Sequence, residues 1–171
     1  MVYLNRHKNN PVQKLNLIGV HECKPDAKNR VALPAALKRQ LQPVLSEGFV
    51  MKRSVFQPCL ELYPMQEWNE VMNKLNTLNR FVKKNTDFIR LYTAGVKVLE
   101  VDGSGRLLIP KDLGQFAGIE QEIILSASGR VVEIWDKVRY NVVVDDAEVD
   151  FGALAEDVMG QFGSDEHTSL S

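Results

Sequence analysis

The spacing of apolar residues predicts a chain built largely from short β-strands. Residues 96–101 (VKVLEV) alternate between apolar and polar side chains and are rich in β-branched types, which predicts a strand. Residues 102–105 (Asp-Gly-Ser-Gly) predict a tight turn, because the Asp carboxylate can accept backbone N–H groups and a glycine can take a positive φ. An extended apolar run resumes at 106–109, and two more strands are expected at 122–126 and 130–135.

Between these predicted strands, other segments have apolar residues spaced three or four positions apart, which predicts helices. A short helix is expected at Pro110, whose missing N–H would be unpaired in a first helical turn anyway. Its inward face is formed by Leu113, Phe116 and Ala117. A longer helix is expected soon after Pro64, with apolar residues three or four positions apart at Trp68, Val71, Met72, Leu75 and Leu78. A second one is expected from Thr86 or Asp87, with Ile89 and Tyr92 facing inward.

Near the end of the chain, Asp150 is expected to cap a last helix. The apolar face of that helix is formed by Phe151, Leu154, Ala155 and Val158. Residues 163–171 (GSDEHTSLS) are expected to be disordered.

One motif, Asp-x-x-x-Arg-x-x-x-Pro, occurs twice. It lies in PDAKNRVALPAAL at 25–37 and in VDGSGRLLIPKDL at 101–113, an offset of 76 residues. A weaker similarity continues downstream between 59–68 and 131–140, at an offset of 72. The chain is therefore expected to contain two units of one plan. The predicted organisation is an N-terminal extension (1–16), a first repeat (17–63), a helical insert (64–94), a second repeat (95–140) and an acidic C-terminal helix and tail (141–171).

Charge is distributed unevenly, although the net charge is only −1. Residues 1–139 hold all 21 Lys and Arg against 14 acidic residues, a balance of +7, whereas 140–171 hold eight acidic residues and no Lys or Arg. Within residues 1–39, eight basic residues stand against two acidic ones. The overall balance argues against a sequence-blind polyanion binder, but positive potential is concentrated around the first motif, where a phosphate backbone could be met.

Composition excludes several other classes. A chain that is 44% hydrophobic and 25% charged is typical of a globular protein. The amino terminus has no apolar run leading to a cleavage site, and no apolar run approaches the roughly 20 residues of a membrane span, so a cytoplasmic protein without membrane contact is expected. Cys23 and Cys59 are too few for a disulfide framework or a paired-cysteine zinc site and are expected to be buried thiols.

An Asp and an Arg separated by three residues around a turn suit a tight polar loop. The simplest interpretation is a salt-bridged turn that only fixes the loop. The alternative is contact with DNA, because Lys24 and Lys28 accompany Arg30, and a basic β-loop can position phosphates and reach guanine edges. Lys38 and Arg39 continue the basic character, either as a solvated helix surface or as phosphate contacts.

Asn29 stands in the first copy where the second has Gly105. Asn tolerates the left-handed backbone region best after glycine, so the same turn is expected in both copies.

Catalytic and metal chemistry have little support. His21 and Cys23 form a His-x-Cys pair, but no second cluster accompanies it, so no metal or other cofactor is expected. Asp26 and Asp102 as paired carboxylates, or Cys23 with His21, are the conceivable catalytic groups. Without a P-loop, a Gly-x-Ser-x-Gly or a His-Glu-x-x-His motif, neither an enzyme nor a small-molecule substrate is expected.

These motifs resemble those of the MraZ family, a two-repeat branch of the SpoVT/AbrB-like DNA-binding proteins. The similarity extends from about Leu17 to Phe162. It is carried mainly by Gly19, 26–30 (DAKNR), Pro34, 59–64 (CLELYP), Trp68, 102–110 (DGSGRLLIP) and 133–135 (EIW).

The resemblance implies an α+β, mainly β fold, in which two swapped-hairpin repeats form a double-split β-barrel with helices on its outer side. It also implies homo-oligomeric, octamer-like rings that bind repeated boxes in double-stranded promoter DNA. The implied function is a nucleoid-associated transcriptional repressor of the gene cluster for cell division and cell-wall synthesis. The residues expected to face DNA are Lys24, Asp26, Lys28, Asn29, Arg30, Lys38, Arg39, Asp102, Ser104, Gly105 and Arg106.

The two copies are not expected to contribute equally. Arg30 is the leading candidate for a DNA-reading residue, whereas Arg106, in a less basic surround with Gly103 and Gly105, is expected to serve the fold more. Outside the repeats, Arg6, Lys8 and Lys14 could add phosphate contacts, and the acidic tail could compete with DNA for the basic surface. The alternatives are an antitoxin-like regulator of the same superfamily, and an oligomeric scaffold or hydrolase that uses the fold without DNA.

Overall fold

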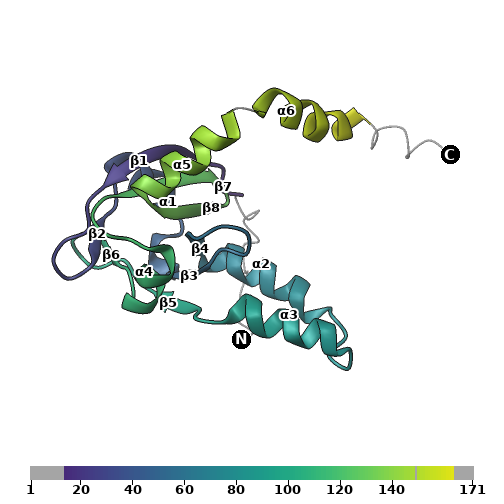
Figure 1. Ribbon diagram of the computed structural model, residues 1–171. Coiled ribbons are helices and arrows are strands. Elements are labelled where there is room, and N and C mark those ends of the chain that lie inside the picture. The colour runs from purple at the N-terminus through teal and green to yellow at the C-terminus, as the bar shows by residue number, and fades with distance from the viewer. Residues whose placement is uncertain (1–13, 149, 164–171) are drawn as a thin grey trace, which may run out of the picture. The chain divides into compact units, whose positions relative to one another are not determined.

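Antiparallel strands make up most of the first part of the molecule. The structure, a computed structural model, describes residues 14–148 and 150–163, and the chain divides into two compact units after Asp136. The strands of the first unit are β1 (Leu17–Cys23), β2 (Arg30–Ala32), β3 (Phe49–Arg53), β4 (Leu60–Pro64), β5 (Lys97–Leu99), β6 (Arg106–Leu108), β7 (Ile123–Gly129) and β8 (Val131–Asp136). Its helices are α1 (Ala35–Leu41), α2 (Met65–Asn76), α3 (Lys83–Thr93), α4 (Lys111–Ala117) and the short 3-10 turn η1 (Leu45–Glu47). The strands form a six-stranded sheet in the order β1-β7-β8-β4-β3-β5 and a separate ribbon of β2 and β6 (Figure 1).

The two repeats exchange strands. Strand β1 of the first repeat pairs with β7 of the second, and β5 of the second pairs with β3 of the first. The ribbon likewise joins one strand from each repeat. Equivalent strands of the two repeats therefore lie equally far from opposite edges of the sheet. The outermost pair is β1 and β5, the next is β7 and β3, and the central pair is β8 and β4. The prediction of a mixed α+β fold with mostly antiparallel strands is confirmed.

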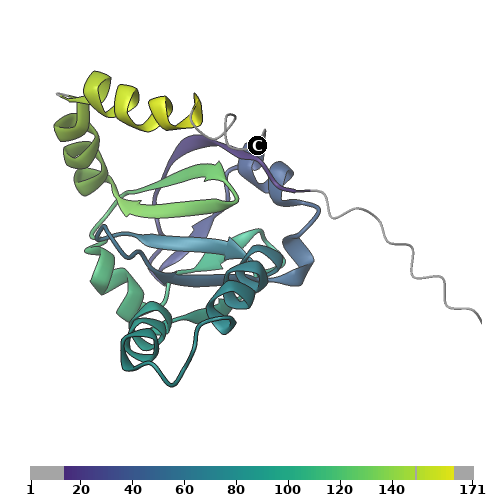
Figure 2. The same ribbon diagram turned by 90° about the vertical axis from the view of Figure 1, so that its right-hand side faces the viewer.

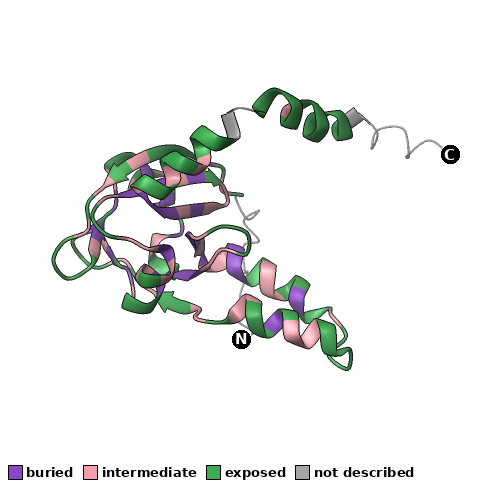
Figure 3. Cartoon of the chain, viewed as in Figure 1, coloured by how far each residue is buried: buried purple, intermediate pink, exposed green. Residues whose placement is uncertain are grey.

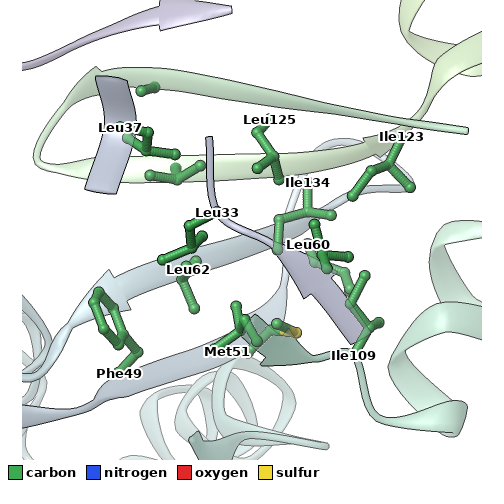
Figure 4. Packing of buried hydrophobic residues seen from close by; sticks show 14 of the residues in the cluster. Leu33, Leu37, Phe49, Met51, Leu60, Leu62, Ile109, Ile123, Leu125 and Ile134 are labelled. Carbon is green, nitrogen blue, oxygen red and sulfur yellow. The ribbon is translucent and has the colours of Figure 1, made fainter. Parts of the chain in front are cut away.

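One apolar cluster takes residues from both sheets and from the two short helices (Figure 4). Leu37 of α1 and Leu113 of α4, at equivalent positions in the two repeats, are both fully buried. Val31 and Leu107 contribute the inward side of the ribbon. Burial of each such side chain stabilises the fold by about 1.5–3 kcal/mol. Both copies of the repeated motif thus serve the same core.

The helical insert is attached through aromatic side chains. Helices α2 and α3 lie side by side (Figure 1 and Figure 2), and Trp68 of α2 stacks on Tyr92 of α3 with ring centroids 6.3 Å apart. Lys52 of β3 is buried beneath them, with its ammonium 4.2 Å from the centre of the Tyr92 ring. The ammonium also donates hydrogen bonds to the Arg53 carbonyl and to the Glu61 carboxylate. Trp68, expected as an apolar residue of this helix, therefore packs inside the protein against Tyr63 and Tyr92.

Several elements begin or end elsewhere than the apolar spacing predicts. The strand expected at 96–101 is reduced to the three residues of β5, because its partner β3 begins only after Gly48, where a φ of 83° turns the chain away. Helix α3 begins at Lys83 instead of Thr86. Its first turn is fixed by the side chains of Asn85 and Thr86, which donate to the carbonyls of Asn79 and Arg80 at 3.0 and 2.9 Å.

The second unit consists of α5 (Lys137–Glu148), α6 (Phe151–Gly160) and the 3-10 turn η2 (Gln161–Gly163). The expected side-chain cap at Asp150 is wrong: its backbone, with φ −117° and ψ 16°, is not in the extended region that a capping side chain requires, and only its carbonyl accepts the Leu154 N–H, at 3.0 Å. The apolar residues of α6, with Phe151 and Leu154 among them, are largely solvent-exposed (Figure 3).

Two expectations concern segments outside the described residues: the basic contacts of Arg6 and Lys8, and the disorder expected after Gly163. Among the residues that are described, no helix is long and apolar enough to cross a membrane.

Candidate nucleic-acid interface

The first Asp–Arg loop is a closed turn organised by one carboxylate. Asp26 Oδ1 accepts the amide N–H groups of Lys28 and Arg30, both at 2.9 Å, and Oδ2 accepts the Nε–H of Arg30 at 2.9 Å. The Asp26 amide in turn donates to the Arg30 carbonyl at 2.9 Å. Asn29 has a φ of 59°, so the left-handed residue predicted for this position is present.

The second loop repeats this geometry. Asp102 Oδ1 accepts the amides of Ser104 and Arg106 at 2.8 and 3.0 Å, and Oδ2 accepts Arg106 Nε–H at 3.0 Å. Gly105 has the corresponding positive φ, 76°. The two arginines are therefore held in the same way, although their neighbours in the sequence differ.

The ribbon connects the two loops directly. Leu33 donates its amide to the Gly105 carbonyl at 3.0 Å, and Ile109 donates its amide to the Asn29 carbonyl at 2.9 Å. In the ribbon, Arg30 is opposite Leu108 and Arg106 is opposite Ala32, so the two arginines are diagonal neighbours across the ribbon. Since Val31 and Leu107 point into the core, Arg30 and Arg106 share the outward face.

Each guanidinium keeps donors for a ligand. Among the described residues, Arg30 and Arg106 make side-chain hydrogen bonds through Nε alone, and their side chains are 31% and 33% exposed. Hydrogen bonds from the Arg30 and Lys28 amides lower the pKa of Asp26 below its ordinary value of 3.8. Bonds from the Arg106 and Ser104 amides lower the pKa of Asp102 in the same way. Both aspartates are thus carboxylates at neutral pH, and each salt-bridged turn leaves the Nη groups of its arginine without a hydrogen bond to the described residues.

The remaining predicted site residues lie at different distances from the loops. Lys24 and Lys28 are exposed beside the first loop. Lys38 is brought to the second loop: a methyl group at Gly105 would lie 2.9 Å from its Nζ. Arg39 is exposed on α1 and points about 100° further around the helix than Lys38. The proximity of Lys38 to Gly105 follows from the exchange of strands, and no local sequence signal indicates it.

The residues considered for catalysis have unsuitable environments. Burial, followed by the nearby Glu22, raises the pKa of the Cys23 thiol, which is half-buried rather than buried as expected. Cys59 is buried as expected, and its burial, followed by the nearby Glu133, raises its pKa to about 12. A nucleophilic cysteine requires a lowered pKa instead. Within residues 14–148 and 150–163, no group of three or more His, Cys, Asp or Glu side chains is placed to hold a metal ion.

Comparison with known proteins gives one consistent result. The family model described as "MraZ protein, putative antitoxin-like" matches residues 17–91 and 93–162. A protein of Christiangramia forsetii named "Transcriptional regulator MraZ" is 62% identical over 146 residues, which cover 85% of this chain and 94% of the relative. Proteins of the same name from Flavobacterium psychrophilum and Phocaeicola vulgatus are 56% and 37% identical. The alignments cover 88% and 85% of this chain and 96% and 95% of the relatives.

Proposed function

Because the chain belongs to the MraZ family, we propose that it is a sequence-specific DNA-binding protein that represses transcription from the promoter of the division and cell-wall gene cluster. The observation that carries this proposal is the ribbon. It joins two Asp–Arg loops of the same geometry and presents both arginines on one solvent-facing side. The relatives are named as transcriptional regulators, which favours a non-enzymatic function.

In this proposal Arg30 and Arg106 contact DNA through their Nη groups. A guanidinium can bond guanine O6 and N7 in the major groove, or a phosphate. Asp26 and Asp102 orient the arginines, and Asn29 and Gly105 supply the left-handed residue that closes each turn. The residues around the loops bind phosphates of the DNA backbone, namely Lys24, Lys28, Ser104, Lys38 and Arg39.

The proposed assembly is an octamer-like ring of double-split β-barrels, each formed by the repeats 17–63 and 95–140, located at the nucleoid. The exchanged strands support the barrel, because in swapped hairpins each repeat completes the sheet of the other. One ribbon offers only two arginines and would bind weakly at cellular salt. A ring that engages several promoter boxes raises the effective concentration of each further ribbon and so makes binding stable.

The test is a fluorescence anisotropy titration of the protein against a duplex from its own upstream region and against a scrambled duplex, at two salt concentrations. We expect the protein to bind the upstream duplex more tightly than the scrambled one. We expect Arg30→Ala to reduce this difference in binding free energy by about 1–3 kcal/mol per site. Arg80→Ala is the matched control, because Arg80 lies in the turn between α2 and α3 and its side chain bonds only Asn76 among the described residues. Equal binding of both duplexes by the wild-type protein would refute the proposal.

The strand topology argues against one alternative, and the same titration tests the other. An antitoxin-like regulator would carry a toxin-wrapping tail after its first DNA loop, where this chain has β5 to β8 paired with the first repeat or with each other. A scaffold or hydrolase would show no sequence preference at either salt concentration.

A further inference from the structure

The loops obtain their positive charge from different places. Beside the first loop stand Lys24 and Lys28, whereas the equivalent residues of the second loop are Glu100 and Ser104. Taken alone, the second loop is therefore an Asp–Arg pair with an additional acid and no lysine. This is the difference that makes it the less basic copy in the sequence.

The structure places a lysine from the first repeat at the second loop. The Lys38 ammonium lies 2.9 Å, and its Cε 3.4 Å, from the position that a Cβ of Gly105 would occupy. Lys38 also lines one recess with Asp102 and Gly103. Among the described residues its side chain forms no hydrogen bond or ion pair, so its charge is not neutralised by a carboxylate within 4.0 Å.

The equivalent position at the first loop is hollow. The counterpart of Lys38 is Gly114, and the counterpart of Gly105 is Asn29. Gly114 and Asn29 line a recess of about 180 Å³, where a Cβ on Gly114 would meet only Ile109 Cγ2, at 3.6 Å. A glycine in the loop therefore faces a lysine on the helix at one end of the ribbon, and an asparagine faces a glycine at the other.

We propose that Lys38 and Arg106 form a phosphate-binding site for the DNA backbone at the second loop, a site that the first repeat completes for the second. The inference rests on the proposed function. Its physical basis is the unpaired ammonium of Lys38, which lies beside Gly105, the residue that precedes Arg106. Arg106 bonds Asp102 through Nε alone and keeps its Nη donors for a ligand. The Asp102 carboxylate already pairs with Arg106 Nε, and no carboxylate of the described residues lies within 4.0 Å of Lys38, so the Lys38 ammonium is available to a phosphodiester. The bare glycine at 105 makes room for the lysine stem.

The test is the salt dependence of DNA binding. Lys38→Met keeps the length of the side chain and its packing on Gly105 but removes the charge. We expect the slope of log K against log salt to become shallower by about 0.9 per lost contact, on both the upstream and the scrambled duplex. The preference between the two duplexes should remain as in the wild type, because a phosphate contact carries no sequence information. Lys84→Met, at an exposed lysine of α3, should leave the slope unchanged.

A second variant moves the site to the other loop. Asn29→Gly combined with Gly114→Lys copies the Gly105–Lys38 arrangement onto the first loop and should steepen the slope by a similar amount. If the wild-type protein prefers its upstream duplex and Arg30→Ala loses that preference, but Lys38→Met keeps the wild-type slope, this inference is wrong and the proposed function stands. If the wild-type protein shows no preference, the proposed function fails. The slope of Lys38→Met on the scrambled duplex then decides the phosphate site separately.

Discussion

At the scale of single residues, one carboxylate in each loop fixes both the backbone turn and the arginine. The folded-state pKa values of Asp26 and Asp102 are lowered by amide hydrogen bonds. Such a group contributes stability at pH values above its unfolded pKa, and that contribution disappears as pH falls through the folded pKa. Protonation would also remove the charge partner of Arg30 and Arg106.

We therefore expect the free energy of unfolding to decrease as pH falls below about 4, partly through these two groups. The measurement is urea denaturation at a series of pH values for the wild-type protein and for Asp26→Asn/Asp102→Asn. The variant should be less stable at neutral pH and should lose less stability on acidification. A variant that loses as much stability as the wild type would show that other carboxylates account for the acid sensitivity.

At the scale of elements, the second loop and helix α1 of the first repeat fit together because Gly105 has no side chain where Lys38 lies. Gly105→Asn keeps a residue that tolerates positive φ, but its Cβ would lie 2.9 Å from Lys38 Nζ. We expect Gly105→Asn to lower the free energy of unfolding by about 1 kcal/mol. Adding Lys38→Gly to the same chain should restore the share of that loss that the contact with Lys38 causes. A double-mutant cycle in urea measures the coupling energy between the two sites. If the stability changes of the two single variants simply add up in the double variant, the contact between Gly105 and Lys38 has no energetic effect and this prediction is wrong.

These elements also show how far the sequence predicts the structure. The turn at 26–30, the left-handed Asn29 and the inward Leu113 are local consequences of residue type and spacing, and all were predictable. The contact of Lys38 with Gly105 joins residues 67 positions apart and depends on which strands pair, which apolar periodicity does not specify. The same limit applies to β5, because its length is set by Gly48 in another repeat.

At the scale of the whole first unit, the exchange of strands makes the repeats mutually dependent. Without the second repeat, β1 has no β7, β2 has no β6 and β3 has no β5. Without the first repeat, β8 likewise loses β4. The buried residues of both ribbon strands would face water in an isolated repeat, so neither half retains enough core to offset the loss of conformational entropy.

We expect the fragments 1–94 and 95–171 to be largely unfolded when each is alone and to recover the β-sheet circular dichroism signal when mixed in equal amounts. Near-ultraviolet signals from the buried Trp68 and Trp135 should return together. The control is a cut between residues 136 and 137, at the boundary along the chain between the two compact units, which should leave the sheet of 1–136 folded. The first repeat could also pair with a second copy of itself, so sedimentation must accompany the spectra. A monomeric 1–94 fragment with a cooperative unfolding transition would contradict the mutual dependence of the repeats.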